Sequence, residues 1–141
     1  MSIFAVTLLA AATAAPVHTI EHTQDETAYT VSYVAHVDAS ARQLGSGTAT
    51  HRGLQRCEVS GVVTVERRIS TASGEAISAM VPGESRLSQT RAGRCVNRAS
   101  MEAGLVAERS ADIRAHLAST AEADHAHLAA TIRAARSLAL R

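Results

Sequence analysis

Two stretches of the chain alternate between apolar and polar side chains in the manner of strands. Residues 28–38 show this pattern, and residues 57–69 show it most clearly. A period of two is typical of a strand with one buried face. A shorter apolar run at 76–81 ends at a Pro-Gly pair, where a strand is expected to stop. Because the connections are short, we predict an antiparallel β-meander over about residues 28–82.

The hydrophobic period then changes to that of a helix. Val106, Leu117 and Leu128 recur every eleven residues and lie on one side of a helical projection. This predicts a long amphipathic helix over about residues 99–140. A capping-box pattern at Ser119 would allow a break there, but the apolar side keeps its phase, which favours one continuous or bent helix. The predicted fold class is therefore α+β.

The first fifteen residues have the form of a signal peptide. Residues 3–15 are largely apolar, and Ala12-Thr13-Ala14 offers the small residues that a signal peptidase needs, although the leader carries no Lys or Arg. The apolar run is too short for the roughly twenty residues of a membrane-spanning helix. Residues 16–27 are polar and predict a flexible tail. The remainder, 28–141, predicts a single α+β domain, with no transmembrane segment in the mature chain.

Cys57 and Cys95 are the two cysteines of the chain. An even pair in an exported protein is most simply one disulfide, and their spacing matches no close-set zinc or redox pair. The pair would close a loop whose entropy is worth about 4 kcal/mol. Together with the leader, the pair predicts a periplasmic or secreted protein.

Composition excludes several classes of function. All fourteen cationic side chains are arginine, and thirteen acidic ones leave a net charge of +1. This near balance gives no basic field for a nucleic acid, so no nucleic-acid partner is expected. The absence of lysine excludes Walker A and Schiff-base sites. We expect no enzymatic activity.

A cluster of arginines follows the predicted meander. The segment Ser85 to Arg98 carries no acid and predicts a loop held by the disulfide, in which guanidinium groups could bind an anion. The alternative is an ordinary solvated loop. The candidate anion-binding residues are Arg86, Arg91, Arg94 and Arg98.

Histidines offer a second candidate chemistry. His18 and His22 frame an H-x-x-E-H pattern near the expected cleavage point, and His116 and His127 lie on one flank of the helix. Histidines eleven residues apart on one helix are about 16 Å apart, too far to share one metal ion unless another element joins them. If another element does join them, these residues could form a copper, nickel or zinc site. This is the alternative to a protein without a cofactor.

The expected function follows from the helix. A rod of about 60 Å exceeds the roughly 30 Å breadth of a small domain, so its own sheet should leave the C-terminal half uncovered. We expect a non-enzymatic binding module that meets a protein partner or a second copy of itself through this helix. The alternative is a periplasmic metal-binding protein. The partner, the oligomeric state and the exact cleavage site are not fixed by the sequence.

Overall fold

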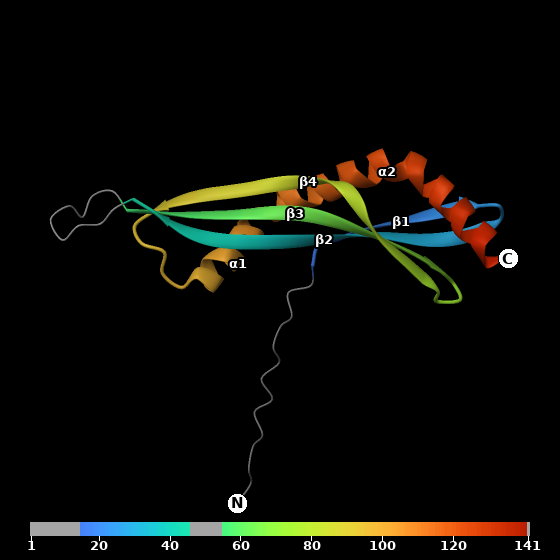
Figure 1. The fold of residues 1–141 in the computed structure, drawn as a ribbon, viewed down its shortest axis with the longest axis horizontal. Helices are drawn as coiled ribbons and strands as arrows, with labels where there is room; N and C mark the ends of the chain where they lie inside the picture. The colour runs from blue at the N-terminus through green and yellow to red at the C-terminus, as the bar shows by residue number, and fades with distance from the viewer. Residues whose placement is uncertain (1–14, 46–54, 141) are drawn as a thin grey trace, which may run out of the picture.

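The fold is a twisted antiparallel sheet with helices on one face (Figure 1). The structure, a computed structural model, describes residues 15–45 and 55–140. The signal peptide predicted for residues 1–15 lies outside this part of the chain, apart from residue 15. The strands lie in sequence order and are β1 (Val17–Gln24), β2 (Thr27–Leu44), β3 (Arg56–Thr71) and β4 (Ala76–Ala92). The helices are α1 (Arg98–Glu108) and α2 (Ser110–Ala139). The predicted α+β class, with a meander, a C-terminal helical region and one disulfide, is confirmed.

The core lies between the helices and one face of the sheet. Alternate residues of β2 and β3, including Val31, Val63 and Val65, are fully buried there. The other face is lined by polar side chains such as Ser32 and Arg68 and has no helix over it among the described residues. The alternation seen in the sequence thus separates residues on the helix-covered face from residues on the open face.

Residues 16–27, predicted to be a flexible tail, instead form the edge strand β1 and its turn. β1 pairs with Thr27–Val34 of β2. Asp25 and Glu26 connect the two strands, and both have positive φ, as a two-residue hairpin turn of type I′ requires. The prediction failed because β1 buries little apolar surface and the turn lacks the usual Asn-Gly or Asp-Gly signal.

The last strand continues well beyond the Pro-Gly pair at which it was expected to stop. β4 runs to Ala92, and its register against β3 shifts between Val63 and Val65. Pro82 is tolerated because β4 is an edge strand, and Gly83 takes a φ of 106° at this irregularity. The segment predicted as an arginine-rich loop is therefore largely strand.

The helical region is bent at Arg109 and not at Ser119, which lies inside α2. Arg109 is hydrogen-bonded to both helices: its N donates to Leu105 O at 2.9 Å, and its O accepts from Ile113 N at 3.0 Å. The helical region therefore has no break near Ser119, but it consists of two helices that meet at Arg109 and not of one continuous helix.

The helices are covered by their own sheet along most of their length, contrary to expectation. Leu105, Ile113, Leu117 and Leu128 are 0% exposed and Ile132 is 3% exposed. The reason is strand length: β2 has 18 residues and β3 has 16, which span roughly 50–60 Å at about 3.3 Å per residue. The expectation that the helical region is longer than the sheet it packs on was therefore wrong for this chain.

Cys57 and Cys95 form the predicted disulfide, with an S–S distance of 2.07 Å. It joins the start of β3 to the segment that precedes α1. Cys57 is fully buried, and its sulfur lies 3.7 Å from the sulfur of Met101 on α1. The disulfide therefore fixes the entry of the helical region against one end of the sheet.

Replacing both cysteines by serine is expected to destabilise the protein by about 4 kcal/mol, because the unfolded chain regains the entropy of a 38-residue loop. The free energy of unfolding in urea measures this loss. Wild type in a phosphine reductant should unfold at the same lower urea concentration as the double variant. A loss below about 1 kcal/mol in both would contradict the assigned role of the disulfide.

Candidate binding groove between β4 and α2

A buried ion pair joins the middle of the sheet to the middle of α2. Nη1 of Arg67 on β3 donates to both carboxylate oxygens of Asp124, at 2.8 and 2.7 Å. The hydroxyl of Tyr33 on β2 donates to the same carboxylate at 2.9 Å. Arg67 is 8% exposed, Asp124 5% and Tyr33 0%. Because Asp124 bonds to two strands at once, it sets how α2 lies across the sheet.

The surroundings of this cluster explain why it holds one geometry. Nη2 of Arg67 donates to Oγ1 of Thr131, one residue before the buried Ile132. Burial raises the pKa of the Tyr33 hydroxyl above its ordinary value, and its hydrogen bond to Asp124 raises it further. Tyr33 therefore stays protonated and remains a donor. A buried charge left without its partner is strongly destabilising, so each member depends on the others.

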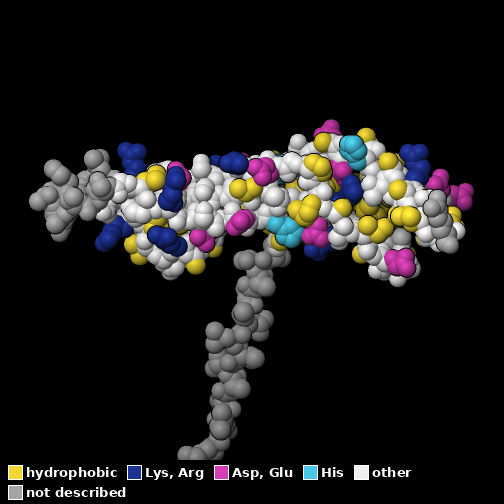
Figure 2. All heavy atoms as spheres, viewed as in Figure 1, with side chains coloured by type: hydrophobic (Ala, Val, Ile, Leu, Met, Phe, Trp, Pro, Cys, Tyr) yellow, Lys and Arg dark blue, Asp and Glu magenta, His cyan; other side chains and the backbone are white. Residues whose placement is uncertain are grey.

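The first half of β4 is left uncovered by α2. Residues Ala76–Met80 are exposed, with Ile77 46% and Met80 58% exposed on opposite faces of the strand. Figure 2 shows hydrophobic side chains gathered over the half of the molecule that holds α2 and the β3–β4 turn. Two pockets lie between β4 and α2, one apolar and one polar. We call the two together the β4–α2 groove, define it by their lining residues, and refer to the pockets as its apolar and polar ends.

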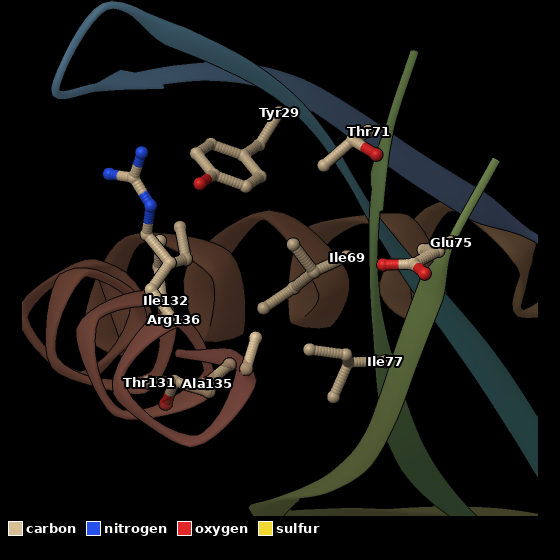
Figure 3. A pocket seen from close by; sticks show the side chains of 10 residues that line it. Tyr29, Ile69, Thr71, Glu75, Ile77, Thr131, Ile132, Ala135 and Arg136 are labelled. Atoms are coloured by element: carbon tan, nitrogen blue, oxygen red, sulfur yellow. The ribbon is translucent and has the colours of Figure 1, made fainter. Parts of the chain in front are cut away.

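The apolar end is a pocket of about 150 Å³ (Figure 3). Ile69 and Ile77 of the sheet face Ile132 and Ala135 of the helix across it, and Arg136 lies at its rim. The aliphatic walls suit an apolar group. The full lining consists of Tyr29, Ile69, Thr71, Glu75, Ile77, Thr131, Ile132, Ala135, Arg136 and Ala139.

The polar end is a pocket of about 270 Å³ that lies four residues further along β4. From β4 it is lined by Val81 and Pro82, which carry no charge. From α2 it is lined by His116, Ser119, Thr120, Ala123, Asp124 and His127. Nε2 of His116 is buried and has no hydrogen-bond partner within the described part of the chain. The sequence placed His116 and His127 on one flank of the helix, and the structure places both in this pocket.

The groove lies beside a free strand edge. β4 ends the sheet on this side, and its residues 76–83 carry no charged side chain. Natural proteins usually protect an exposed edge with charges, because its unpaired backbone groups can pair with another chain. The free part of β2, beyond its pairing with β1, has such charges at Asp38 and Arg42. β1, the strand at the other edge of the sheet, carries Glu21. The uncharged stretch of β4 is therefore an edge suited to pairing.

The four arginines predicted to bind one anion are not brought together. Arg86 lies on the open face of the sheet, where it pairs with Glu84 at 3.2 Å. Arg91 lies on the helix face and pairs with Glu108 of α1 at 2.8 Å. Arg94 and Arg98 line a shallow pocket beyond the end of β4. Because residues 85–92 form a strand, alternation separates side chains that a loop could have gathered.

The histidines predicted as metal ligands lie on two sides of α2. His18 and His22 of β1 face the side that carries His125, and the rings of His22 and His125 meet edge to face with centroids 5.7 Å apart. His116 and His127 lie in the β4–α2 groove. Among residues 15–45 and 55–140, no group of three or more His, Cys, Asp or Glu is placed to hold a metal ion. The four candidates therefore form no common site.

In comparisons with protein-family models, curated proteins and solved structures, no match to this chain was found. The helices of the described part of the chain include none that is long and apolar enough to cross a membrane.

The buried ion pair was not predicted, although the sequence carries a signal for it. Arg67 falls on the apolar side of the alternation in β3, between Val65 and Ile69. Asp124 falls on the apolar side of α2, seven residues after Leu117. A lone charge at a buried position of a strand and an opposite charge at a buried position of a helix together predict a buried pair.

Asp124→Ala is expected to destabilise the protein by roughly 3–5 kcal/mol, because it leaves the Arg67 charge buried without a partner. The matched control is Asp112→Ala, also on α2, which breaks an exposed ion pair with Arg109. This variant should lose less than about 1 kcal/mol of stability. Urea unfolding of both variants gives the comparison. Equal losses would show that the Asp124 contact does not hold the helix in place.

Proposed function

We propose that this protein is a non-enzymatic binding module that takes up an extended peptide segment of a partner protein. The segment pairs with the free edge of β4 as a fifth strand, and one apolar side chain enters the pocket between Ile77 and α2. The observation that carries the proposal is the combination of an uncharged, exposed edge strand with an apolar pocket directly beside it.

Strand addition is a recurring mode of peptide recognition. Main-chain hydrogen bonds supply affinity, and pockets for alternate side chains supply specificity. The pocket of about 150 Å³ has the size of a cavity that accommodates benzene in another protein, roughly 150 Å³. A leucine or phenylalanine side chain therefore suits it.

As expected from the sequence, the proposed partner is a protein, but the contact surface is the edge of β4 and not the C-terminal helix. The sheet was expected to leave the C-terminal half of the helix uncovered, yet Leu128 and Ile132 are buried. α2 contributes one wall of the groove instead, with Ala135 and Ala139 beside the pocket. Self-association through the same edge is the competing arrangement, and the experiment below distinguishes the two.

We also propose that the protein acts in the periplasm or outside the cell. The disulfide between Cys57 and Cys95 supports this, because such bonds persist mainly in oxidising compartments. The apolar leader and its small residues give the second support. The metal-binding alternative has weaker support, because its four histidines are divided between the two sides of α2.

Panning random dodecapeptides on phage against the folded protein tests the proposed function. We expect enrichment of peptides with β-branched residues around one large apolar residue, binding with micromolar Kd in calorimetry. Ile77→Lys, at the pocket, and Met80→Lys, on the open face of the same strand, should each weaken binding at least about tenfold, because either charge disturbs the added strand.

The matched control is Ser40→Lys, which puts the same charge on the exposed part of β2 and should leave binding unchanged. Peptides that bind all three variants equally would contradict the proposal. If sedimentation shows that the wild type is a dimer and that Ile77→Lys makes it a monomer, the edge of β4 binds a second copy of the chain. That result would also overturn the proposed function.

A further inference from the structure

We infer that the peptide segment carries an acidic residue four positions before its apolar anchor, and that His116 and His127 recognise this carboxylate. The inference rests on the proposed function, since it names a second contact of the same docked strand. It assigns a role to the polar end of the β4–α2 groove.

The spacing follows from the register of β4. Ile77 lines the apolar pocket, and Val81 lines the polar one. Their partners on β3, Ile69 and Val65, both lie on the helix-covered face. In a strand that pairs with β4, the residues opposite Ile77 and Val81 are likewise four apart and point to the same face. Each pocket then receives one side chain, about 13 Å from the other.

The direction of the added strand sets the order of the two residues. All neighbouring strands of this sheet pair antiparallel, and antiparallel pairing is slightly more stable per residue than parallel pairing. An antiparallel partner meets Val81 before it meets Ile77. The residue for the polar pocket therefore precedes the apolar anchor in the partner's sequence.

The chemistry of the polar pocket favours a carboxylate. Both oxygens of Asp124 already accept hydrogen bonds from Arg67, and Tyr33 adds another. The Asp124 charge is balanced by Arg67, so the pair adds no net charge to the pocket. The remaining polar groups are the His116 and His127 rings and the hydroxyls of Ser119 and Thr120.

These groups can all donate a hydrogen bond. Nε2 of His116 is buried without a partner in the free protein, within the described residues. Because this atom is shielded from the pocket, the His116 ring has to turn for a carboxylate to supply the missing acceptor. Hydrogen bonds to a charged group are the strong ones. A lysine or arginine in the same place would find no free carboxylate among the lining residues. We therefore assign the pocket to aspartate or glutamate.

Three synthetic nonapeptides, acetylated and amidated, test the inference. KTETVTLTK has glutamate four positions before leucine, KTQTVTLTK replaces the acid by its amide, and KTLTVTETK has the same composition in the opposite order. Calorimetry at low salt and pH 6 should show the first peptide binding roughly tenfold more tightly than either of the others. The third peptide controls for net charge, because it differs from the first only in order.

Variants of the protein locate the effect. His116→Ala with His127→Ala removes both ring donors and should bring the affinity of KTETVTLTK down to that of its glutamine form, while His125→Ala, on the other side of α2, should leave the difference intact. If the double variant does not fold, His127→Ala alone serves, because His127 is exposed, and it should reduce the difference at least twofold.

The outcomes separate this inference from the proposed function. Equal binding of the three peptides, with loss of binding in Ile77→Lys, would overturn the carboxylate assignment and leave strand addition standing. A lack of binding by all three, with panned peptides that carry no acid at this spacing, would also overturn the assignment. Panning that yields no β4-dependent peptide would instead overturn the proposed function.

Discussion

The contact of Asp124 with Arg67 and Tyr33 is the constraint on which the rest of the structure depends. The core of this chain is mostly aliphatic, with Tyr29 and Tyr33 as its aromatic members, and aliphatic side chains pack with little angular preference. A helix that meets them could lie at several angles. Three charge-assisted hydrogen bonds from two strands to one carboxylate select a single angle, because any other would leave a buried charge unpaired.

That angle decides which part of the sheet remains exposed. α2 contacts all four strands, most extensively β1. The turn between β1 and β2 is tied to α2 by an ion pair of Arg136 with Asp25 at 2.9 Å. With the helix held toward β1, the first half of β4 has nothing over it among the described residues (Figure 1). The β4–α2 groove is thus a consequence of the buried pair.

Hydrophobic periodicity was sufficient for the fold class and insufficient for the edges of the sheet. β3 and α2 bury one face each, so their periods of two and 3.6 were visible. β1 buries little, and Ile20 is the one aliphatic residue on its inner face, so its pattern resembled a tail. β4 tolerates Pro82 because an edge strand needs fewer backbone donors, and this concealed its second half.

The β4–α2 groove could not be predicted from the sequence for a different reason. It is formed where β4 meets a helix whose lining residues lie more than thirty positions further along the chain, and the Arg67–Asp124 pair helps to set the position of that helix. The sequence pattern shows which charges fall on buried faces, as at Arg67. It does not show where α2 lies on the sheet. The cysteines needed no such information, because two sulfurs allow a single pairing.

Hydrogen exchange of the β4 amides in the free protein, followed by NMR, tests the central claim most directly. If the buried pair holds α2 away from this edge, alternate amides of Ala76–Val81 exchange within minutes at neutral pH, while those of β3 stay protected for far longer. Protection of every amide in Ala76–Val81 to the level of β3 would mean that the edge is already covered, and would contradict the account.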